Sequence, residues 1–203
     1  HTENDVYLRE PIDWHATYLM LVKKEGRKIF IDGGAHDGCS ARKYRAVYDP
    51  DCECEILSFE PGIETQKCDP NHLIIRAALW NEDGHIDFFE DTKRKYGSSV
   101  MKDKRTGKLD KENPHRVISI NLSKWITDHY SVLDSLELKL DVEGAEYIIL
   151  DQMLKDGSMK LVDSLHIEWH HHKVGVSKSE HDRIVLAIEV LHIPIEEWDA
   201  IGY

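Results

Sequence analysis

Residues 29–38, IFIDGGAHDG, decide the fold, because an apolar run there ends in an acid and a glycine-rich turn. Glycine lacks a Cβ, so Gly34 and Gly38 let the chain turn sharply, approach a ligand and pack against a following helix. We expect a strand over 28–32 and a helix over 40–47 whose N-terminal amides face that ligand. The pattern indicates a nucleotide-type pocket, although a tight strand-to-helix connection without a ligand uses glycine as well.

Residues 57–61, LSFEP, form a second apolar run, and it ends in the carboxylate of Glu60. In dinucleotide-binding folds, an acid at the end of the second strand accepts hydrogen bonds from ribose hydroxyls, about 20 residues after the glycine turn. The gap is somewhat longer here, and a longer connection around residues 49–53 accounts for the difference. Together with the glycine turn, Glu60 favours an adenosine-containing ligand.

Residues 138–146, LKLDVEGAE, indicate a strand that runs into an acidic cluster and then a helix. Asp141, Glu143 and Glu146 lie at the carboxyl end of that strand, where open parallel sheets bind ligands. Three carboxylates within six residues repel one another unless cations, substrate hydroxyls or helix amides offset their charge. The cluster therefore indicates a functional site.

Residues 166–172, HIEWHHH, carry the remaining chemistry. Alternate residues of a strand share a face, so we expect His166, Glu168 and His170 to line up. If this strand neighbours the one that ends at Asp141, Glu168 and His170 approach the acidic cluster. Acids and imidazoles in one cleft suit either a general base or a divalent metal such as Mg²⁺ or Mn²⁺, with Asp141, Glu168 and His170 as ligands. The other side chains of the run are expected to be core or exposed loop: Trp169, His171 and His172.

Four motifs, in this order, resemble those of the FkbM family of S-adenosylmethionine-dependent methyltransferases: residues 30–38, 59–61, 77–79 and 139–146. The resemblance covers about residues 28 to 168, and KLDVEGAE at 139–146 is its most family-specific piece. It implies a class I, Rossmann-like methyltransferase fold that transfers a methyl group from S-adenosylmethionine to a hydroxyl, commonly on a sugar or polyketide. Family members commonly carry Asn in place of His36 and a Leu-Asp pair in place of Leu122 and Ser123, which leaves the acceptor open.

The expected site residues fall into two groups. Those expected to hold the cofactor are Asp32, Gly34, His36, Asp37, Gly38, Glu60, Ala78 and Asp141. Those expected to activate the acceptor hydroxyl are Asp141, Glu143, Glu168 and His170, with Glu146 in the same cluster.

Two other classes of protein share parts of this pattern. A Rossmann-like module that binds a nucleoside without catalysis would keep the pocket, but it leaves the acidic cluster unexplained. A nicotinamide-dependent oxidoreductase requires a fuller Gly-x-Gly-x-x-Gly motif with room for a pyrophosphate at the helix N-terminus. In this chain Asp37 lies where that phosphate would approach, so the oxidoreductase ranks last.

Strand-like and helix-like runs alternate along the chain. We expect further strands near 55–59, 73–78, 86–89, 117–120, 164–169 and 193–198, and helices over 11–24, 122–129, 145–155 and 179–191. The alternation predicts one α/β domain over residues 1–203 with a mainly parallel, doubly wound sheet. A polar stretch over 91–114 interrupts it and is expected to be a lid or binding loop.

Composition restricts the classes of partner and the cellular location that we expect. The net charge of −12 argues against nucleic acid as a partner, because proteins that bind it draw affinity from Lys and Arg. The family resemblance implies a small-molecule or glycan acceptor instead. No apolar run approaches the roughly 20 residues that span a bilayer, and no secretory signal is visible. The four cysteines include no Cys-x-x-Cys pair, so we expect free thiols and a cytoplasmic enzyme. Basic residues over 93–108 are expected to be a solvated loop or a lid that attracts an anionic acceptor.

Overall fold

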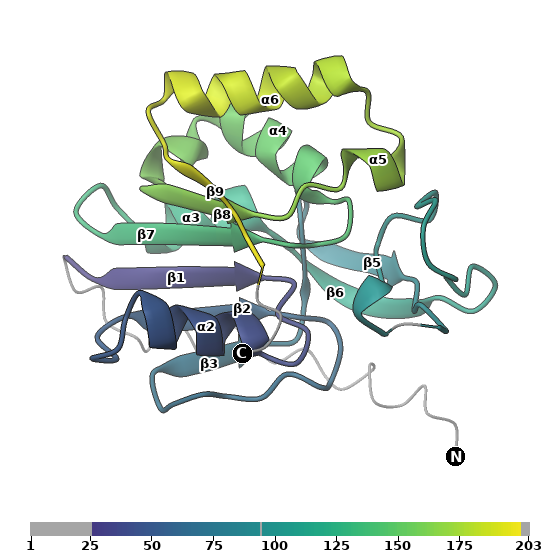
Figure 1. The fold of residues 1–203 in the computed structure, drawn as a ribbon, viewed down its shortest axis with the longest axis horizontal. Helices are drawn as coiled ribbons and strands as arrows, with labels where there is room; N and C mark the ends of the chain where they lie inside the picture. Colours follow the sequence, from purple (N-terminus) through teal and green to yellow (C-terminus); the bar gives the residue numbers. More distant parts are fainter. Residues whose placement is uncertain (1–25, 94, 200–203) are drawn as a thin grey trace.

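The computed structural model describes residues 26–93 and 95–199, which form a six-stranded parallel sheet beside a smaller three-stranded sheet (Figure 1). The larger sheet has the order β3-β2-β1-β7-β8-β9. Its strands are β1 (Lys28–Gly33), β2 (Glu55–Phe59), β3 (His72–Ile75), β7 (Ser135–Leu140), β8 (Ser164–Ile167) and β9 (Ile195–Glu197). The strand order reverses between β1 and β7, and open α/β sheets bind their ligands at such a switch point.

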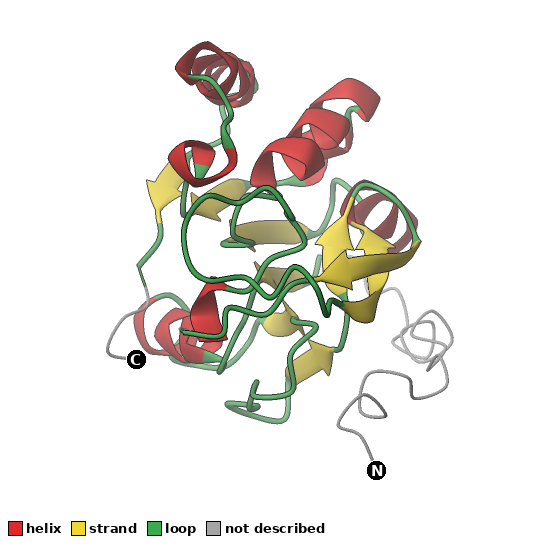
Figure 2. Ribbon diagram, turned by 90° about the vertical axis from the view of Figure 1, so that its right-hand side faces the viewer, coloured by secondary structure: helices red, strands yellow, loops and turns green. Residues whose placement is uncertain are grey.

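Helices cover both faces of this sheet, as Figure 2 shows in a view along the strands. One face carries α2 (Cys39–Val47), and the other carries α3 (Leu122–His129), α4 (Glu146–Asp156) and α6 (Lys178–Val190). Alternate residues of β1 serve the two faces, because Ile29 and Ile31 join the core of the second group of helices. Phe30 points the other way and stacks on Tyr44 of α2, with ring centroids 3.9 Å apart. The predicted doubly wound α/β fold is confirmed.

The helix boundaries follow from capping residues. Asn121 begins α3 by accepting a hydrogen bond from Lys124 N at 3.0 Å, and Ser177 begins α6 by accepting one from Glu180 N at 3.2 Å. Gly157 ends α4 in a left-handed conformation with φ of 83°. The helices expected over 40–47, 122–129, 145–155 and 179–191 are thus present, and the one expected over 11–24 lies outside the described residues.

The smaller sheet contains β4 (Ala78–Trp80), β6 (His115–Asn121) and β5 (Gly84–Phe88), in that order. The expectation of a single strand over 73–78 is wrong, because the chain leaves the larger sheet after Ile75. A tight turn with a hydrogen bond from Ala77 N to Ile75 O, at 2.9 Å, separates β3 from β4. The strands expected near 86–89 and 117–120 belong to this second sheet, where β6 is parallel to β4 and antiparallel to β5.

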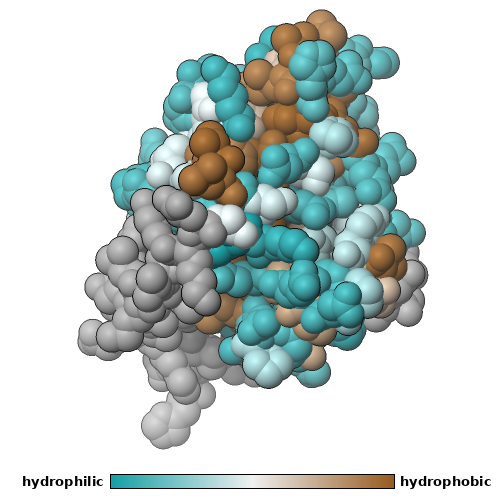
Figure 3. Space-filling view, turned by 90° about the vertical axis from the view of Figure 1, so that its left-hand side faces the viewer, coloured by the Kyte–Doolittle hydropathy of each residue, from teal (hydrophilic) through white to brown (hydrophobic). Residues whose placement is uncertain are grey.

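The face at the amino ends of the larger sheet's strands appears in Figure 3, where apolar surface gathers toward the top, in the region of α4 and α6. Leu186 and Val190 of α6 are among the exposed apolar residues. No helix in the described ranges is long and apolar enough to cross a membrane. All four cysteines are free.

Candidate active site

A cleft of about 1750 Å³ opens at the carboxyl ends of β1, β2 and β7. Its wall comes from the turn after β1, the loop after β2, the segment after β5 and the acidic segment after β7. Most of the predicted site residues line it: Gly34, His36, Asp37, Glu60, Ala78, Asp141, Glu143 and Glu168. Within the described part of the chain, the lining does not include four others: Asp32, Gly38, Glu146 and His170.

The turn after β1 depends on two glycines. Gly34 and Gly38 have φ of 76° and 89°, a left-handed conformation that favours glycine. A Cβ on Gly34 would overlap the main-chain oxygen of Asp141, so the turn lies directly against the end of β7. Asp37 Oδ1 accepts a hydrogen bond from Cys39 N at 2.9 Å at the start of α2. The glycines therefore bring the turn and the acidic strand end together.

Glu60 follows β2, and two main-chain amides orient its carboxylate. Oε2 accepts a hydrogen bond from His36 N at 2.9 Å, and Oε1 accepts one from Gly62 N at 2.8 Å. A carboxylate oxygen can accept two hydrogen bonds, so each oxygen retains capacity for a ligand hydroxyl. The Glu60 carboxylate is therefore a pre-oriented hydrogen-bond acceptor on the wall of the cleft.

Asp32 and Lys139 form a fully buried ion pair beneath the turn. Lys139 Nζ lies 3.1 Å from Asp32 Oδ1 and donates to the main-chain oxygen of Gly34 at 2.8 Å. Ser58 Oγ donates to the other carboxylate oxygen of Asp32 at 2.9 Å. Burial by itself lowers the pKa of Lys139, but the charges of Asp32 and Asp141 and the hydrogen bond to Asp32 together outweigh it, and the pKa lies above its ordinary value. Asp32 thus supports the turn from below.

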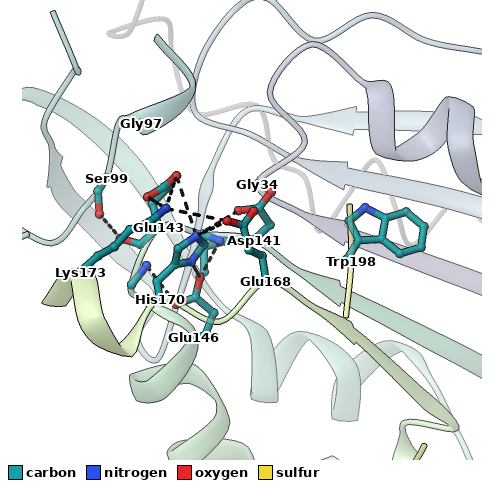
Figure 4. A network of polar contacts seen from close by, with 12 residues as sticks. Gly34, Gly97, Ser99, Asp141, Glu143, Glu146, Glu168, His170, Lys173 and Trp198 are labelled. Atoms are coloured by element: carbon teal, nitrogen blue, oxygen red, sulfur yellow. Dashed lines mark hydrogen bonds and ion pairs between the residues drawn. The ribbon is translucent and has the colours of Figure 1, made fainter. Parts of the chain in front are cut away.

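The ends of β7 and β8 bring Asp141, Glu168 and His170 around one point (Figure 4). Leu140 and Ile167 are partners in the parallel pairing of these strands, so Asp141 and Glu168 follow at the same edge of the sheet. His170 Nε2 lies 3.1 Å from Glu168 Oε1 and 3.8 Å from Asp141 Oδ1. The three residues that the sequence singles out as metal ligands or bases therefore lie together.

Glu146 holds His170 in place from the first turn of α4. Its carboxylate is fully buried and accepts hydrogen bonds from Val142 N at 3.0 Å and Gly144 N at 2.9 Å. Its Oε1 also lies 2.7 Å from His170 Nδ1. Because a carboxylate only accepts, Nδ1 carries a proton and Nε2 is the nitrogen that faces Asp141 and Glu168.

We call the cluster of Asp141, Glu143, Glu146, Glu168 and His170 the acidic corner. Burial and charge set the pKa values of its residues. Burial, only partly offset by Lys139, raises the pKa of Asp141 to about 6. Burial alone would lower the pKa of His170, but its contacts with Glu146 and Glu168 raise that pKa to about 10. The surrounding carboxylates thus favour positive charge at the centre of the corner.

The segment between β5 and β6, residues 89–114, which we call the lid, contacts Glu143 at the end of β7. It contains a short 3₁₀ helix, η2 (Lys95–Gly97), and Lys104 Nζ lies 2.7 Å from Glu143 Oε2. Lys173 of α5 (His171–Val174) contacts the same oxygen at 3.2 Å, and Ser99 Oγ donates to the Glu143 main-chain oxygen at 2.9 Å. The expectation of a solvated basic loop is wrong for Lys104, which is buried because it pairs with Glu143.

His166 does not join the acidic corner, so the prediction that it shares a strand face with Glu168 and His170 is wrong. β8 ends at Ile167, and the alternation that would align the three residues ends with it. His166 Nε2 instead lies 2.9 Å from Glu137 Oε2, on the side of the sheet that carries α2.

The aromatic residues near the site have separate roles. Trp169 is half-buried and packs against Tyr147 and His181 at the edge of the core, with centroid distances of 5.7 Å and 4.8 Å. The expectation of an exposed loop at His171 and His172 is wrong, because both lie in a short helix, α5; His172 is exposed, whereas His171 is only partly exposed and its ring lies 4.6 Å from that of His181. Trp198, which the sequence did not mark, lines the cleft.

The fold and the cleft define a class of protein. A parallel sheet with a glycine turn after its first strand and an oriented acid after its second is typical of Rossmann-like methyltransferases. The family model described as the methyltransferase FkbM domain matches residues 32–192, and the chain therefore belongs to this family of methyltransferases, as its motifs predicted. Comparison with curated proteins gave no match, and comparison with solved structures gave none either. The family implies S-adenosylmethionine as the cofactor.

Proposed function

We propose that the protein transfers a methyl group from S-adenosylmethionine to a hydroxyl of a small molecule or glycan, with a sugar hydroxyl as the favoured acceptor. The observation that carries this proposal is that Asp141 and Glu168 line the same cleft as Gly34 and Glu60. A cofactor-type turn and a pair of carboxylates thus share one cavity. Its volume exceeds the roughly 300–1,000 Å³ of a typical single-ligand pocket, which leaves room for a cofactor and an acceptor together.

The cofactor half of the cleft fits S-adenosylmethionine. The Glu60 carboxylate is fixed by main-chain amides and keeps acceptor capacity for two ribose hydroxyls. Ala78 and Leu79 provide apolar surface in the same cleft, suited to an adenine ring. The bound cofactor would supply a methyl group that its positively charged sulfonium activates.

The acceptor half supports removal of a proton. A hydroxyl becomes a better nucleophile as it loses its proton, and a positioned carboxylate contributes about 100- to 10,000-fold to such a step. Asp141 and Glu168 lie at the cleft wall and serve as the acceptors of that proton in this proposal. Glu143, held by Lys104 and Lys173, positions the lid, and His170 positions the two carboxylates.

Calorimetric titration with S-adenosylhomocysteine tests the cofactor half, with NAD as the comparison ligand. We expect micromolar binding of S-adenosylhomocysteine and no binding of NAD. A screen of hydroxyl-bearing acceptors with a methyl-labelled cofactor then tests the reaction. Absence of S-adenosylhomocysteine binding would refute the proposal, and binding without turnover on any acceptor would favour the nucleoside-binding module.

A further inference from the structure

The imidazole of His170 is held as a metal ligand is held. The residue is fully buried, and its Nδ1 lies 2.7 Å from the Glu146 carboxylate, which two main-chain amides fix in turn. Its Nε2 faces the cleft wall, and although Glu168 Oε1 lies 3.1 Å away, this nitrogen makes no well-formed hydrogen bond with any described residue. A carboxylate on one ring nitrogen and an open position on the other is the arrangement by which proteins orient metal-binding histidines.

Two carboxylates flank that open nitrogen at distances that suit one ion. Glu168 Oε1 lies 3.1 Å and Asp141 Oδ1 lies 3.8 Å from His170 Nε2, and all three ligand atoms lie within 4.8 Å of one another. For metal–ligand bonds of about 2.1 Å, ligands at right angles are about 3.0 Å apart and tetrahedral ligands about 3.4 Å apart. The 3.1 Å separation matches the right-angle value and the 3.8 Å separation is slightly wider than the tetrahedral value, so an ion that binds all three atoms would draw Asp141 slightly closer.

The acidic corner and its neighbours also contain more carboxylates than ammonium groups. The contacts join five carboxylates, those of Asp32, Asp141, Glu143, Glu146 and Glu168, to three ammonium groups, those of Lys104, Lys139 and Lys173. With His170 neutral, the form in which an imidazole binds a metal, the difference is two negative charges, which equals the charge of one divalent ion. Unbalanced carboxylates at such short range repel one another, so a bound ion would stabilise the arrangement.

We infer that Asp141, Glu168 and His170 bind one divalent cation, with Glu146 as the outer partner that orients His170. One imidazole nitrogen and two carboxylate oxygens favour a first-row ion such as Mn²⁺, with Mg²⁺ as a weaker occupant. Because Asp141 and Glu168 line the cleft, the remaining coordination positions face it. This deepens the proposed function, on which its chemical meaning rests. With an ion bound, Asp141 and Glu168 would act as its ligands in place of accepting the proton directly. An acceptor with two neighbouring oxygens, such as a sugar diol, would bind the ion, which would lower the pKa of the hydroxyl.

Electron paramagnetic resonance titration of Mn²⁺ into the purified protein tests the site without any acceptor. We expect one bound Mn²⁺ per chain in the wild type. Glu168→Gln is the main variant, because the Glu168 side chain is 48% exposed and its substitution spares the core. Glu146→Gln removes the outer partner of His170 and should lower the Mn²⁺ affinity by about 10- to 100-fold. Glu168→Gln removes a ligand itself and should lower the Mn²⁺ affinity at least as much.

Glu90→Gln is the matched control, since Glu90 lines the same cleft and its side chain is 49% exposed. Its Mn²⁺ affinity should equal that of the wild type. Absence of stoichiometric Mn²⁺ binding, or equal affinity in Glu168→Gln and wild type, would overturn the inference. S-adenosylhomocysteine titration of the same samples separates the two proposals. A protein that binds S-adenosylhomocysteine but no Mn²⁺ refutes the metal site alone. A protein that binds Mn²⁺ but no S-adenosylhomocysteine supports the metal site and refutes the proposed function.

Discussion

The ammonium group of Lys139 lies 3.1 Å from the carboxylate of Asp32, with neither residue exposed to solvent. The same Nζ donates to the main-chain oxygens of Gly33 and Gly34, so the pair couples β7 to the turn after β1. A buried charge that loses its partner keeps its desolvation cost. Each half of the pair therefore depends on the other, and the turn depends on both.

Lys139→Met should destabilise the protein by about 3–5 kcal/mol, because it leaves Asp32 charged, buried and without its counterion. Urea denaturation measures this change. The double variant Asp32→Asn with Lys139→Met should lose less stability than the sum of the losses in the two single variants. Lys28→Met is the control, since Lys28 pairs with Glu53 at the surface, where an ion pair contributes little to stability. Additive single effects would contradict the coupling.

Glu60→Gln should weaken binding of S-adenosylhomocysteine by about 10- to 100-fold, because hydrogen bonds to a charged group contribute about 1.5–3 kcal/mol. Glutamine has nearly the same shape, so thermal unfolding should show that the fold is retained. Isothermal titration calorimetry gives the affinity. Glu197→Gln removes an exposed acid from β9 of the same sheet and should leave the affinity unchanged. Equal affinity in Glu60→Gln and wild type would exclude Glu60 from the cofactor site.

Lys104→Met should loosen the lid, because Lys104 donates to Gly97 O and pairs with Glu143. Loss of one charge-assisted hydrogen bond of about 1.5 kcal/mol corresponds to about 10-fold faster local opening. Hydrogen–deuterium exchange should show faster exchange in peptides that cover 95–108, with unchanged exchange in β1 and β7. Lys102→Met, at an exposed lysine of the same lid, should exchange like the wild type. If peptides of the lid exchange at the same rate in Lys104→Met as in Lys102→Met and the wild type, other contacts hold the lid.

Asp134 should make stability depend on acid pH. Burial by itself raises the pKa of this carboxyl, but hydrogen bonds from Ser131 N, at 3.0 Å, and Arg27 N, at 3.1 Å, hold it below its ordinary value. A lowered pKa in the folded state contributes stability above the unfolded pKa of about 3.9, and that contribution is lost as the pH falls through the folded value. Asp134→Asn should therefore be less stable than the wild type at pH 6, and the gap should narrow below about pH 4.

Urea denaturation over a series of pH values measures that gap. Asp87→Asn removes a carboxylate that pairs with Arg116 at the surface, and it controls for the change in net charge. A stability gap between Asp134→Asn and wild type that stays constant from pH 6 to pH 3 would rule out the linkage.

The glycine turn and the strand ends around the cleft could be predicted because their signals are local. Gly34 and Gly38 mark a turn whose left-handed conformations few other residues adopt, and the apolar runs before Asp32 and Glu60 mark strands. The meeting of Asp141 and Glu168 follows from one further rule, that parallel neighbours end at the same edge of a sheet. Periodicity and topology together were sufficient for these residues.

The partners of the acidic residues could not be predicted, because they come from distant parts of the chain. Lys104 reaches Glu143 from the lid, and Lys139 reaches Gly34 from the neighbouring strand. One signal did exist: Lys139 interrupts the apolar end of β7, and a lysine at such a position must find counterions. The division into two sheets was also missed, because the turn after Ile75 depends on the main chain and carries no glycine or proline.

The antiparallel pairing of Phe88 with His115 affects how this enzyme can be altered. The lid leaves and re-enters the smaller sheet at adjacent positions, and the entropy of closing a loop grows only slowly with its length. Natural variation or protein engineering can therefore lengthen or exchange this segment, provided that the contact between Lys104 and Glu143 is kept. The glycine turn after β1 belongs to the other sheet and would be inherited unchanged, so under the proposed function new acceptor specificities would evolve on a constant methyl-donor scaffold.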